Sequence, residues 1–254
     1  MLLAIDVGNT NIKIGLCIDG NWLYRWQVRT QINATADEYG IVMRNLLSQS
    51  SIDPAEVAII IISSVVPPAT GSLERMIVSL FGKTPLIVKP GIKSGIRIRT
   101  DNPAEVGSDL VCGAVAAYEK FKSGCIVVGF GTALTFTAVA EPGDLLGVAI
   151  APGLNYASEA LFEHTAQLRL IDLTVPETAI GKNTVHSMQS GILFGYVGIV
   201  ESIIRRFRAE IPGPAEVIGT GGQAEIIAPL TDAFTEIDPW LNLEGLRIIA
   251  ERNR

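Results

Sequence analysis

Leu3-Ala4-Ile5-Asp6-Val7-Gly8-Asn9-Thr10-Asn11-Ile12-Lys13-Ile14-Gly15 is an apolar strand, a tight polar turn and a second strand within thirteen residues. Residues 3–5 are apolar and typical of a strand. Residues 11–15 alternate between polar and apolar side chains, which is the pattern of a half-buried strand. Gly8 lets the turn between them come close to a bound group. The stretch therefore predicts a hairpin whose turn carries the chemistry.

The polar residues of this turn suit a phosphate group. The amides of Gly8, Asn9 and Thr10, together with the Asn9 and Thr10 side chains, can donate hydrogen bonds to phosphate oxygens. Asp6 can hold a magnesium ion, directly or through water, and Lys13 can meet a phosphate. The alternative is an ordinary hairpin, in which Asp6 binds turn amides and Lys13 lies on a solvated face. The hairpin alone does not decide between the two.

Composition excludes some classes of function. The chain has 254 residues, enough for one large domain or two smaller ones, and a formal charge of -6. This charge argues against a nucleic-acid or anionic-membrane surface and leaves room for a local basic pocket. The longest apolar run, residues 57–66, is too short to span a bilayer and predicts a buried strand; no transmembrane helix is expected. Residues 1–6 lack a basic region before an apolar run, so we expect a cytoplasmic protein without a signal peptide.

The three cysteines do not form a recognisable pattern. Cys17, Cys112 and Cys125 are odd in number, widely spaced and set among apolar residues. Disulfides and metal sites need paired or clustered cysteines. We expect three buried thiols.

The order of predicted elements repeats. In the first half, the hairpin is followed by a strand at 21–30, a helix at 37–49, a strand at 57–66, a helix at 69–81 and a strand at 85–88, and then by a crossover at 90–106 and a helix at 109–120. The second half opens with the similar stretch 125–136 and continues with a strand at 145–151, helices at 156–165 and 184–210, and a strand at 216–219. Two halves that open alike indicate a duplication.

Corresponding positions of the two hairpins differ in chemistry. Gly129 takes the place of Asp6, Gly131 that of Gly8, and Thr132 that of Asn9. The last strand of the second half runs into Thr220-Gly221-Gly222, and a helix containing Leu241, Leu243, Gly245 and Leu246 is expected to pack back toward the first half.

Two phosphate hairpins followed by a Gly-Gly turn are the plan of actin, hexokinase and the acetate and sugar kinases, and the chain resembles a compact member of that superfamily. The resemblance implies an α/β, duplicated actin-like (ribonuclease H-like) ATPase fold with two domains around a nucleotide cleft. Residues 1–121 would hold the first phosphate hairpin. Residues 122–254 would hold the second hairpin and the Gly221-Gly222 turn on the adenosine side.

A narrower resemblance rests on seven ordered motifs. They are Asp6-x-Gly8-Asn9-Thr10, Ser63-Ser64-Val65-Val66-Pro67, Asn102-Pro103-x-x-Val106-Gly107-x-Asp109, Gly131-Thr132-Ala133, Ala151-Pro152-Gly153-Leu154, Gly181-Lys182-Asn183-Thr184 and Thr220-Gly221-Gly222. Together they resemble type III pantothenate kinase from end to end. The resemblance implies phosphorylation of pantothenate by ATP, the first step toward coenzyme A. It also implies a homodimer that acts on a small molecule, with magnesium and with potassium or ammonium as activators.

The resemblance also implies roles for individual residues. Asp6 to Lys13 would be the ATP phosphate loop, with Gly131 and Thr132 as further nucleotide contacts. Gly107, Ser108, Asp109 and Leu110 would lie against the substrate, with Asp109 as the proton acceptor, and Thr184 would contact the substrate in the dimeric site. A carboxylate within reach of the attacking hydroxyl suits phosphoryl transfer. From spacing alone, however, Ser108 and Asp109 fit the start of the following helix better than a catalytic role, and Asn183 likewise fits a helix cap.

Three departures from the family concern the acceptor and cation side. The family has an aspartate ligand for the monovalent cation where this chain has Gly129, so we expect a lost or altered potassium dependence. It has an arginine after the base where this chain has Leu110, which predicts weaker pantothenate binding. Gly147-Val148 and Thr100-Asp101 also differ from its pattern. Three hypotheses follow: a working pantothenate kinase, a kinase for another small alcohol, and a catalytically silent nucleotide-binding paralogue.

Overall fold

The computed structural model describes all 254 residues, which form two compact units. Unit 1 consists of Met1–Gly95, Asn102–Ala116 and Leu241–Arg254, and unit 2 of Ile96–Asp101 and Ala117–Trp240. Each unit contains one β-sheet, which confirms the α/β class. The division differs from the expected boundary at residue 121 because the C-terminal segment packs with unit 1 and helix α3 (Ser108–Phe121) contributes to both units.

The sheet of unit 1 is built around the first strand, as predicted. Its order is β3-β2-β1-β4-β5. The antiparallel strands β1 (Leu2–Val7), β2 (Asn11–Ile18) and β3 (Asn21–Arg29) form the hairpin and its continuation, and β4 (Ile59–Ser64) and β5 (Leu86–Ile87) add in parallel. The register pairs Asp6 with Lys13 on one side and with Ser63 on the other.

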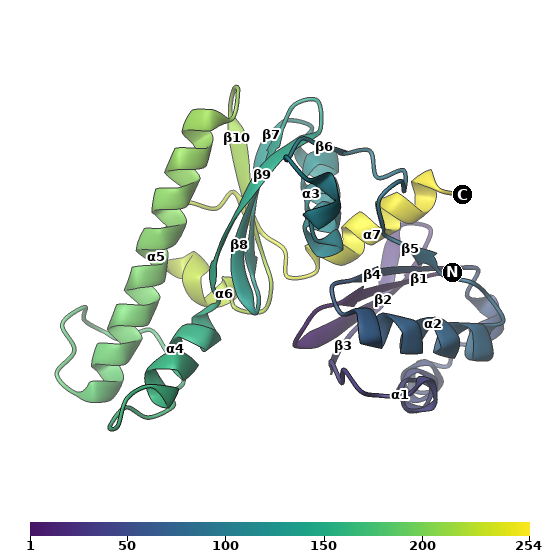
Figure 1. Cartoon of the computed structure of the whole chain (residues 1–254), viewed down its shortest axis with the longest axis horizontal. Helices are drawn as coiled ribbons and strands as arrows, with labels where there is room; N and C mark the ends of the chain where they lie inside the picture. Colours follow the sequence, from purple (N-terminus) through teal and green to yellow (C-terminus); the bar gives the residue numbers. More distant parts are fainter. The chain divides into compact units, whose positions relative to one another are not determined.

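Helices cover both faces of this sheet (Figure 1). Side chains alternate along a strand, so β1 turns Leu3, Ile5 and Val7 to one face and Leu2, Ala4 and Asp6 to the other. The first set packs with helices α1 (Ala36–Gln49) and α2 (Pro67–Phe81) in a buried apolar core. Helix α7 (Leu241–Arg252) lies on the other face, against β1, β2 and β4, which confirms that the C-terminal helix returns to the first half.

The sheet of unit 2 repeats this arrangement. Its order is β11-β10-β7-β8-β9-β6. Strands β7 (Gly124–Phe130), β8 (Ala133–Ala140) and β9 (Asp144–Pro152) are antiparallel neighbours, like the first three strands of unit 1, and β10 (Ala215–Thr220) lies parallel to β7 as β4 lies parallel to β1. The short strands β6 (Arg97–Ile98) and β11 (Glu236–Ile237) form the edges. The predicted duplication is confirmed.

One long helix supports unit 2. Helix α5 (Thr184–Glu210) packs Leu193, Tyr196 and Val200 into an apolar core with β7 and β8, beside α4 (Leu154–Glu163) and the short α6 (Ala224–Ile227). By length and composition alone α5 also qualifies as a membrane span, contrary to the expectation that no helix would, and 44% of its apolar window is buried inside the protein. Its packing in the core accounts for the buried part of its apolar surface.

Several element boundaries differ from the predicted ones. Helix α2 begins at Pro67, two residues before the predicted start, because proline fits the first turn of a helix, where no amide donor is needed. Helix α4 begins at Leu154 and ends at Glu163. The 90–106 crossover contains β6 and a 3-10 turn at Pro103–Glu105. Two other 3-10 turns lie at Pro54–Glu56 and Ala228–Leu230. All three cysteines are free and buried, as predicted.

Candidate active site

Asp6 is a buried carboxylate with one unsatisfied oxygen. Its Oδ2 accepts a hydrogen bond from Asn242 Nδ2 at 3.0 Å, whereas its Oδ1 is buried and has no partner. Burial raises the pKa of Asp6 to about 6; the Asn242 hydrogen bond opposes this rise, the Asp109 charge adds to it, and the Lys13 charge opposes it. A buried oxygen without a partner is costly unless something binds it. Asp6 therefore has the features of a ligand-binding carboxylate.

Asp6 and the residues around it fit a magnesium ion. Magnesium prefers carboxylate oxygens, retains several waters and needs one or two protein ligands beside the phosphates of a nucleotide. The unpartnered Oδ1 of Asp6 is such an oxygen. No group of three or more acidic, histidine or cysteine side chains that could hold a metal occurs in the structure. A single carboxylate is consistent with an ion that is held mainly by its nucleotide and by water.

The turn after Asp6 is tighter than the sequence suggested. The Gly8 amide donates to the Asn11 carbonyl at 3.0 Å, and the Thr30 hydroxyl donates to the Gly8 carbonyl at 2.6 Å. The expectation that the Gly8 amide donates to phosphate is therefore wrong for this structure, because closing the two-strand turn uses it. A Cβ at Gly8 would lie 3.1 Å from the Asn11 carbonyl oxygen. Asn9 and Thr10 form the exposed part of the turn.

Asp109 lies in the first turn of α3, close to Asp6 in the fold of unit 1. Burial raises the pKa of Asp109, and backbone hydrogen bonds from Leu110 and from its own amide lower it by less. A Cβ at Gly107 would lie 2.4 Å from Asp109 Oδ1, so Gly107 leaves the space that this carboxylate occupies. The helix begins at Ser108, so Asp109 belongs to its first turn, where the helix dipole stabilises a negative charge.

Ser108 fastens α3 to the end of β4. Its hydroxyl accepts from the Ser64 amide at 3.0 Å, donates to the Ser64 carbonyl at 3.1 Å and lies 3.0 Å from the Ser63 hydroxyl. These contacts use its hydrogen-bonding capacity within unit 1. Among residues 107–110, which are predicted to lie against the substrate, Ser108 is thus occupied by the fold, and Leu110 is half-buried and apolar.

Unit 2 brings three glycine-containing segments together. The β7–β8 turn repeats the first hairpin, with the Gly131 amide donating to the Ala133 carbonyl at 3.1 Å. The Gly153 amide donates to the Thr132 carbonyl, also at 3.1 Å. Gly221 has φ +96°, and a Cβ there would lie 2.2 Å from the Phe130 carbonyl oxygen. The structure therefore places Gly221 directly beside the β7–β8 turn, which holds Gly131 and Thr132.

Gly129 is packed too closely for a larger side chain in the present arrangement. It pairs with Thr135 of β8 and with Thr220 of β10. A Cβ at Gly129 would lie 2.6 Å from Thr135 Oγ1. Thr135 thus occupies the space where a side chain at residue 129 would begin.

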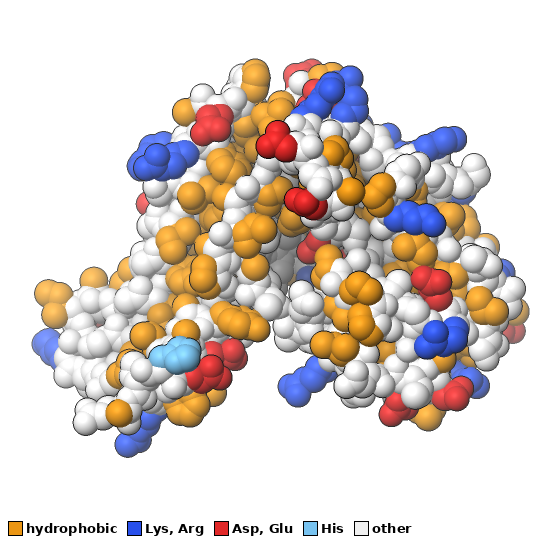
Figure 2. Space-filling model, in the orientation of Figure 1, with side chains coloured by type: hydrophobic (Ala, Val, Ile, Leu, Met, Phe, Trp, Pro, Cys, Tyr) orange, Lys and Arg blue, Asp and Glu red, His pale blue; other side chains and the backbone are white.

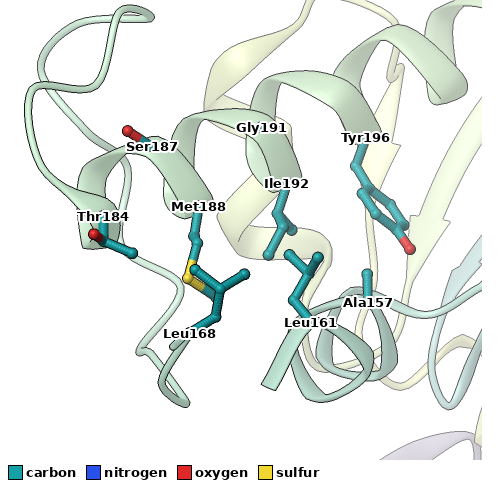
Figure 3. Close-up of a pocket in the computed structure, with 9 residues that line it drawn as sticks. All are labelled: Ala157, Leu161, Leu168, Thr184, Ser187, Met188, Gly191, Ile192 and Tyr196. Atoms are coloured by element: carbon teal, nitrogen blue, oxygen red, sulfur yellow. The ribbon is translucent and has the colours of Figure 1, made fainter. Parts of the chain in front are cut away.

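The start of α5 holds Thr184 beside a pocket. Asn183 caps the helix by accepting from the His186 amide at 2.9 Å, as the spacing suggested. Between α4 and α5 lies an open pocket of about 560 Å³ (Figure 3). Leu161 and Leu168 point toward Met188 and Ile192 across it. Its nine lining residues are Ala157, Leu161, Leu168, Thr184, Ser187, Met188, Gly191, Ile192 and Tyr196.

Sequence reasoning missed Asn242, because a hydrogen bond across 236 residues leaves no local pattern. It also missed the part that Ser63 plays in holding Ser108. The packing of the C-terminal helix onto the first half was predicted. That prediction is the only signal in the sequence that could have pointed to Asn242.

Comparisons with known proteins agree with the motifs. The family model of type III pantothenate kinase matches residues 2–206. A type III pantothenate kinase of Myxococcus xanthus is 47% identical over 253 residues, covering 100% of this chain and 99% of the relative. One of Geobacter sulfurreducens is 49% identical over 255 residues and covers both chains fully, at 100% each. The solved inorganic polyphosphate/ATP-glucomannokinase of an Arthrobacter strain has a TM-score of 0.50 and 16% identity over 99% of this chain and 97% of its own, which indicates a shared fold alone.

Proposed function

Because the chain belongs to the type III pantothenate kinase family, it is a small-molecule kinase that phosphorylates pantothenate with ATP in coenzyme A biosynthesis, and we propose how its residues divide that reaction. Asp109 is the general base and Asp6 is the magnesium ligand. The observation that carries this proposal is a pair of carboxylates in unit 1, each with a raised pKa: Asp109 is half-buried, and Asp6 is buried with one unsatisfied oxygen.

Asp109 takes the proton of the attacking hydroxyl. The hydroxyl oxygen of pantothenate forms a bond to the γ-phosphorus of ATP, the bond to the bridging oxygen breaks, and ADP leaves with that electron pair. The proton released from the hydroxyl goes to the Asp109 carboxylate. A raised pKa makes this carboxylate a better base than an exposed aspartate, and a base with a pKa closer to the operating pH works more efficiently.

Each unit has a turn whose residues suit a nucleotide. Asn9, Thr10 and Lys13 in unit 1, and Thr132 in unit 2, supply polar groups for the phosphates. Gly131, Gly221 and Gly222 provide the close backbone approach that a nucleotide needs. Bound magnesium neutralises charge on the phosphates, and Asp6 Oδ1 is the oxygen that would hold it.

Pantothenate recognition is less polar than the motifs alone suggest. Gly107 to Leu110 lies on the acceptor side, with Thr184 contributing from a second protomer. A hydrogen bond to a charged group is typically worth about 1.5–3 kcal/mol, so Leu110 in place of the family arginine weakens pantothenate binding. A different small alcohol as the acceptor remains the alternative that Leu110 and Thr100 favour.

Potassium and ammonium are not needed for turnover in this chain. Gly129 has no carboxylate, and Thr135 Oγ1 occupies the space in which one would begin. The remaining proposals are that the enzyme is a cytoplasmic homodimer and binds neither nucleic acid nor membranes. The net charge of -6 supports the absence of a nucleic-acid or anionic-membrane partner.

The test is ADP release from ATP and magnesium with pantothenate, with and without potassium. We expect turnover in both salts and loss of turnover in Asp109→Asn. Asp37→Asn is the matched control, because Asp37 is an exposed acid in the first turn of α1 and lies away from the proposed site.

Three results would contradict the proposal. Equal turnover in Asp109→Asn and Asp37→Asn would show that Asp109 only stabilises the helix start. Strong activation by potassium would contradict the proposal that Gly129 abolishes the need for this cation. ATP binding without turnover on pantothenate would direct the search to other small alcohols.

A further inference from the structure

We infer that Asn242, near the start of α7, is a positioning residue for Asp6. Its amide holds one carboxylate oxygen of Asp6 and keeps the other available for a ligand. The inference rests on the proposed function, because it takes Asp6 as the residue that meets the magnesium of bound ATP.

The contact is specific to one oxygen. Asn242 Nδ2 donates to Asp6 Oδ2 at 3.0 Å, and Asp6 Oδ1 is buried without a partner. The Ser63 hydroxyl beside Asp6 lies 3.0 Å from Ser108 Oγ. The Ser63 hydroxyl also lowers the pKa of Asp6. Asn242 is the side chain whose hydrogen bond to the carboxylate has good geometry, and Oδ1 is left without a partner.

The following residues of α7 are all fixed against unit 1. Glu244 accepts a hydrogen bond from Trp22 Nε1 at 3.0 Å. Leu243 packs against Gly15, where a Cβ would lie 2.9 Å from Leu243 Cδ1. Gly245 lies so close to α3 that its own Cβ would be 2.0 Å from the carbonyl oxygen of Cys112.

These contacts determine where the Asn242 amide lies. Successive residues of a helix are about 100° apart around its axis, so contacts at three successive positions restrain both rotation and sliding of the helix. Asn242 precedes them directly and is placed by them. The C-terminal helix therefore carries a restrained donor to the first strand.

An amide suits this position better than a charged donor. Asn242 donates a hydrogen bond but has no charge, so Asp6 keeps its full negative charge for a cation. A lysine or arginine would compete with the cation, and an apolar side chain would leave Oδ2 unpaired as well. Partners that orient a metal-binding carboxylate commonly affect metal affinity or activity by about 10- to 100-fold.

The experiment compares Asn242→Ala and Asn242→Asp with the control Asn253→Ala. Asn253 is also on the C-terminal segment and donates to the carbonyls of Lys93 and Ile249 at 3.0 and 2.8 Å, away from Asp6. Calorimetry would measure binding of ATP with and without magnesium, and kinetics would measure kcat and KM for each substrate. Thermal unfolding would establish that each variant is folded.

We expect both Asn242 variants to lose about 10- to 100-fold in kcat/KM for magnesium-ATP, with little change in the KM for pantothenate. Their affinity for magnesium-ATP falls toward their affinity for metal-free ATP. Asn253→Ala keeps the wild-type ratio of these two affinities. Asn242→Asp has the size of the native residue, so it keeps the test open if the alanine variant does not fold.

Asp6→Asn separates the inference from the proposal on which it rests. If Asp6→Asn binds magnesium-ATP like the wild type, the proposed role of Asp6 fails. If Asp6→Asn loses the magnesium effect but both Asn242 variants behave like Asn253→Ala, the inference about Asn242 is overturned. An equal loss of affinity for ATP with and without magnesium would also overturn it, because that result reports a general structural effect.

Discussion

At the scale of single residues, the burial of Asp6, the proposed magnesium ligand, lowers the stability of the protein. In the metal-free protein, burial raises its pKa from 3.8 to about 6. A carboxyl whose folded pKa is raised contributes stability that is complete below pH 3.8 and is lost as the pH rises through 6. The difference corresponds to about 3 kcal/mol.

We therefore predict that Asp6→Asn is more stable than the wild type above pH 6 and loses this part of the pH dependence. The expected gain in the free energy of unfolding is up to about 3 kcal/mol at pH 7. Urea unfolding of both proteins without magnesium, between pH 3.5 and pH 8, would measure it. Parallel stability curves for the two proteins over that range would contradict the prediction.

The sequence predicted a role for this residue but not its surroundings. Asp6 follows from the strand and turn pattern, and Asp109 from a family motif. Whether each hydrogen-bonding group already has a partner within the protein depends on the tertiary structure. The Gly8 amide is used by Asn11, and the Ser108 hydroxyl by Ser63 and Ser64, which no spacing rule indicates.

At the scale of elements, the position of α7 depends on a glycine. A Cβ at Gly245 would lie 2.0 Å from the carbonyl oxygen of Cys112, which is backbone and cannot move aside alone. A glycine inside a helix is otherwise unfavourable by about 1 kcal/mol relative to alanine. Close packing of α7 on α3 therefore outweighs helix propensity at this position.

We predict opposite effects for two glycine-to-alanine changes in helices. Gly245→Ala should destabilise the protein by about 1–3 kcal/mol through overpacking, and should shift Asn242 relative to Asp6. Gly71→Ala in α2, where the nearest atom to a Cβ is the Arg75 guanidinium at 3.6 Å, should stabilise it by about 0.5–1 kcal/mol. Chemical denaturation measures both, and equal effects of the two substitutions would contradict the packing argument.

Long periodic elements were predicted with accurate bounds, whereas of the two-residue strands β5 lies inside the predicted strand at 85–88 and β6 lies in the predicted crossover. Hairpins and amphipathic helices carry their pattern over eight or more residues, and α1, α3 and α5 lie within one residue of the predicted bounds. The two-residue strands β5 and β6 have too few residues for a period, and they form because a neighbouring strand offers unpaired backbone groups. Their precise bounds therefore depend on tertiary structure.

At the scale of the whole molecule, the duplication explains most of the chain and the C-terminal helix is the exception. Each unit has a three-stranded antiparallel opening and a parallel strand beside its first strand. A division of the sequence into two consecutive halves follows from this repeat. Residues 241–254 belong to unit 1 nonetheless, because α7 covers the face of its sheet that bears Leu2, Ala4 and Asp6.

The surface of unit 2 favours the proposed homodimer. Tyr156 and Phe162 of α4, and Val185 and Ile199 of α5, are 37–55% exposed. Figure 2 shows hydrophobic side chains on the surface where α4 and α5 lie. Large exposed apolar patches on a folded protein usually mark an interaction site.

Three glycines make one face of α5 flat. Gly191, Gly195 and Gly198 recur at helical spacing, and a Cβ at each would have no neighbour within 4 Å. Glycines at these positions weaken the helix, and a close approach of another element would compensate for that loss. We infer that the same face of a second protomer provides it.

This arrangement predicts opposite results for two substitutions of Gly195. Gly195→Ala and Gly195→Arg both strengthen the helix by close to 1 kcal/mol, because glycine is the weaker helix former. Only arginine is too large for a close helix contact. We expect the wild type and Gly195→Ala to sediment as dimers, and Gly195→Arg to sediment as a folded monomer. Since Thr184 is proposed to act across the dimer, the monomer should also show a higher KM for pantothenate while its affinity for ATP is retained. A wild type that is monomeric at micromolar concentration would contradict the homodimer, and a dimeric Gly195→Arg would place the interface on another face.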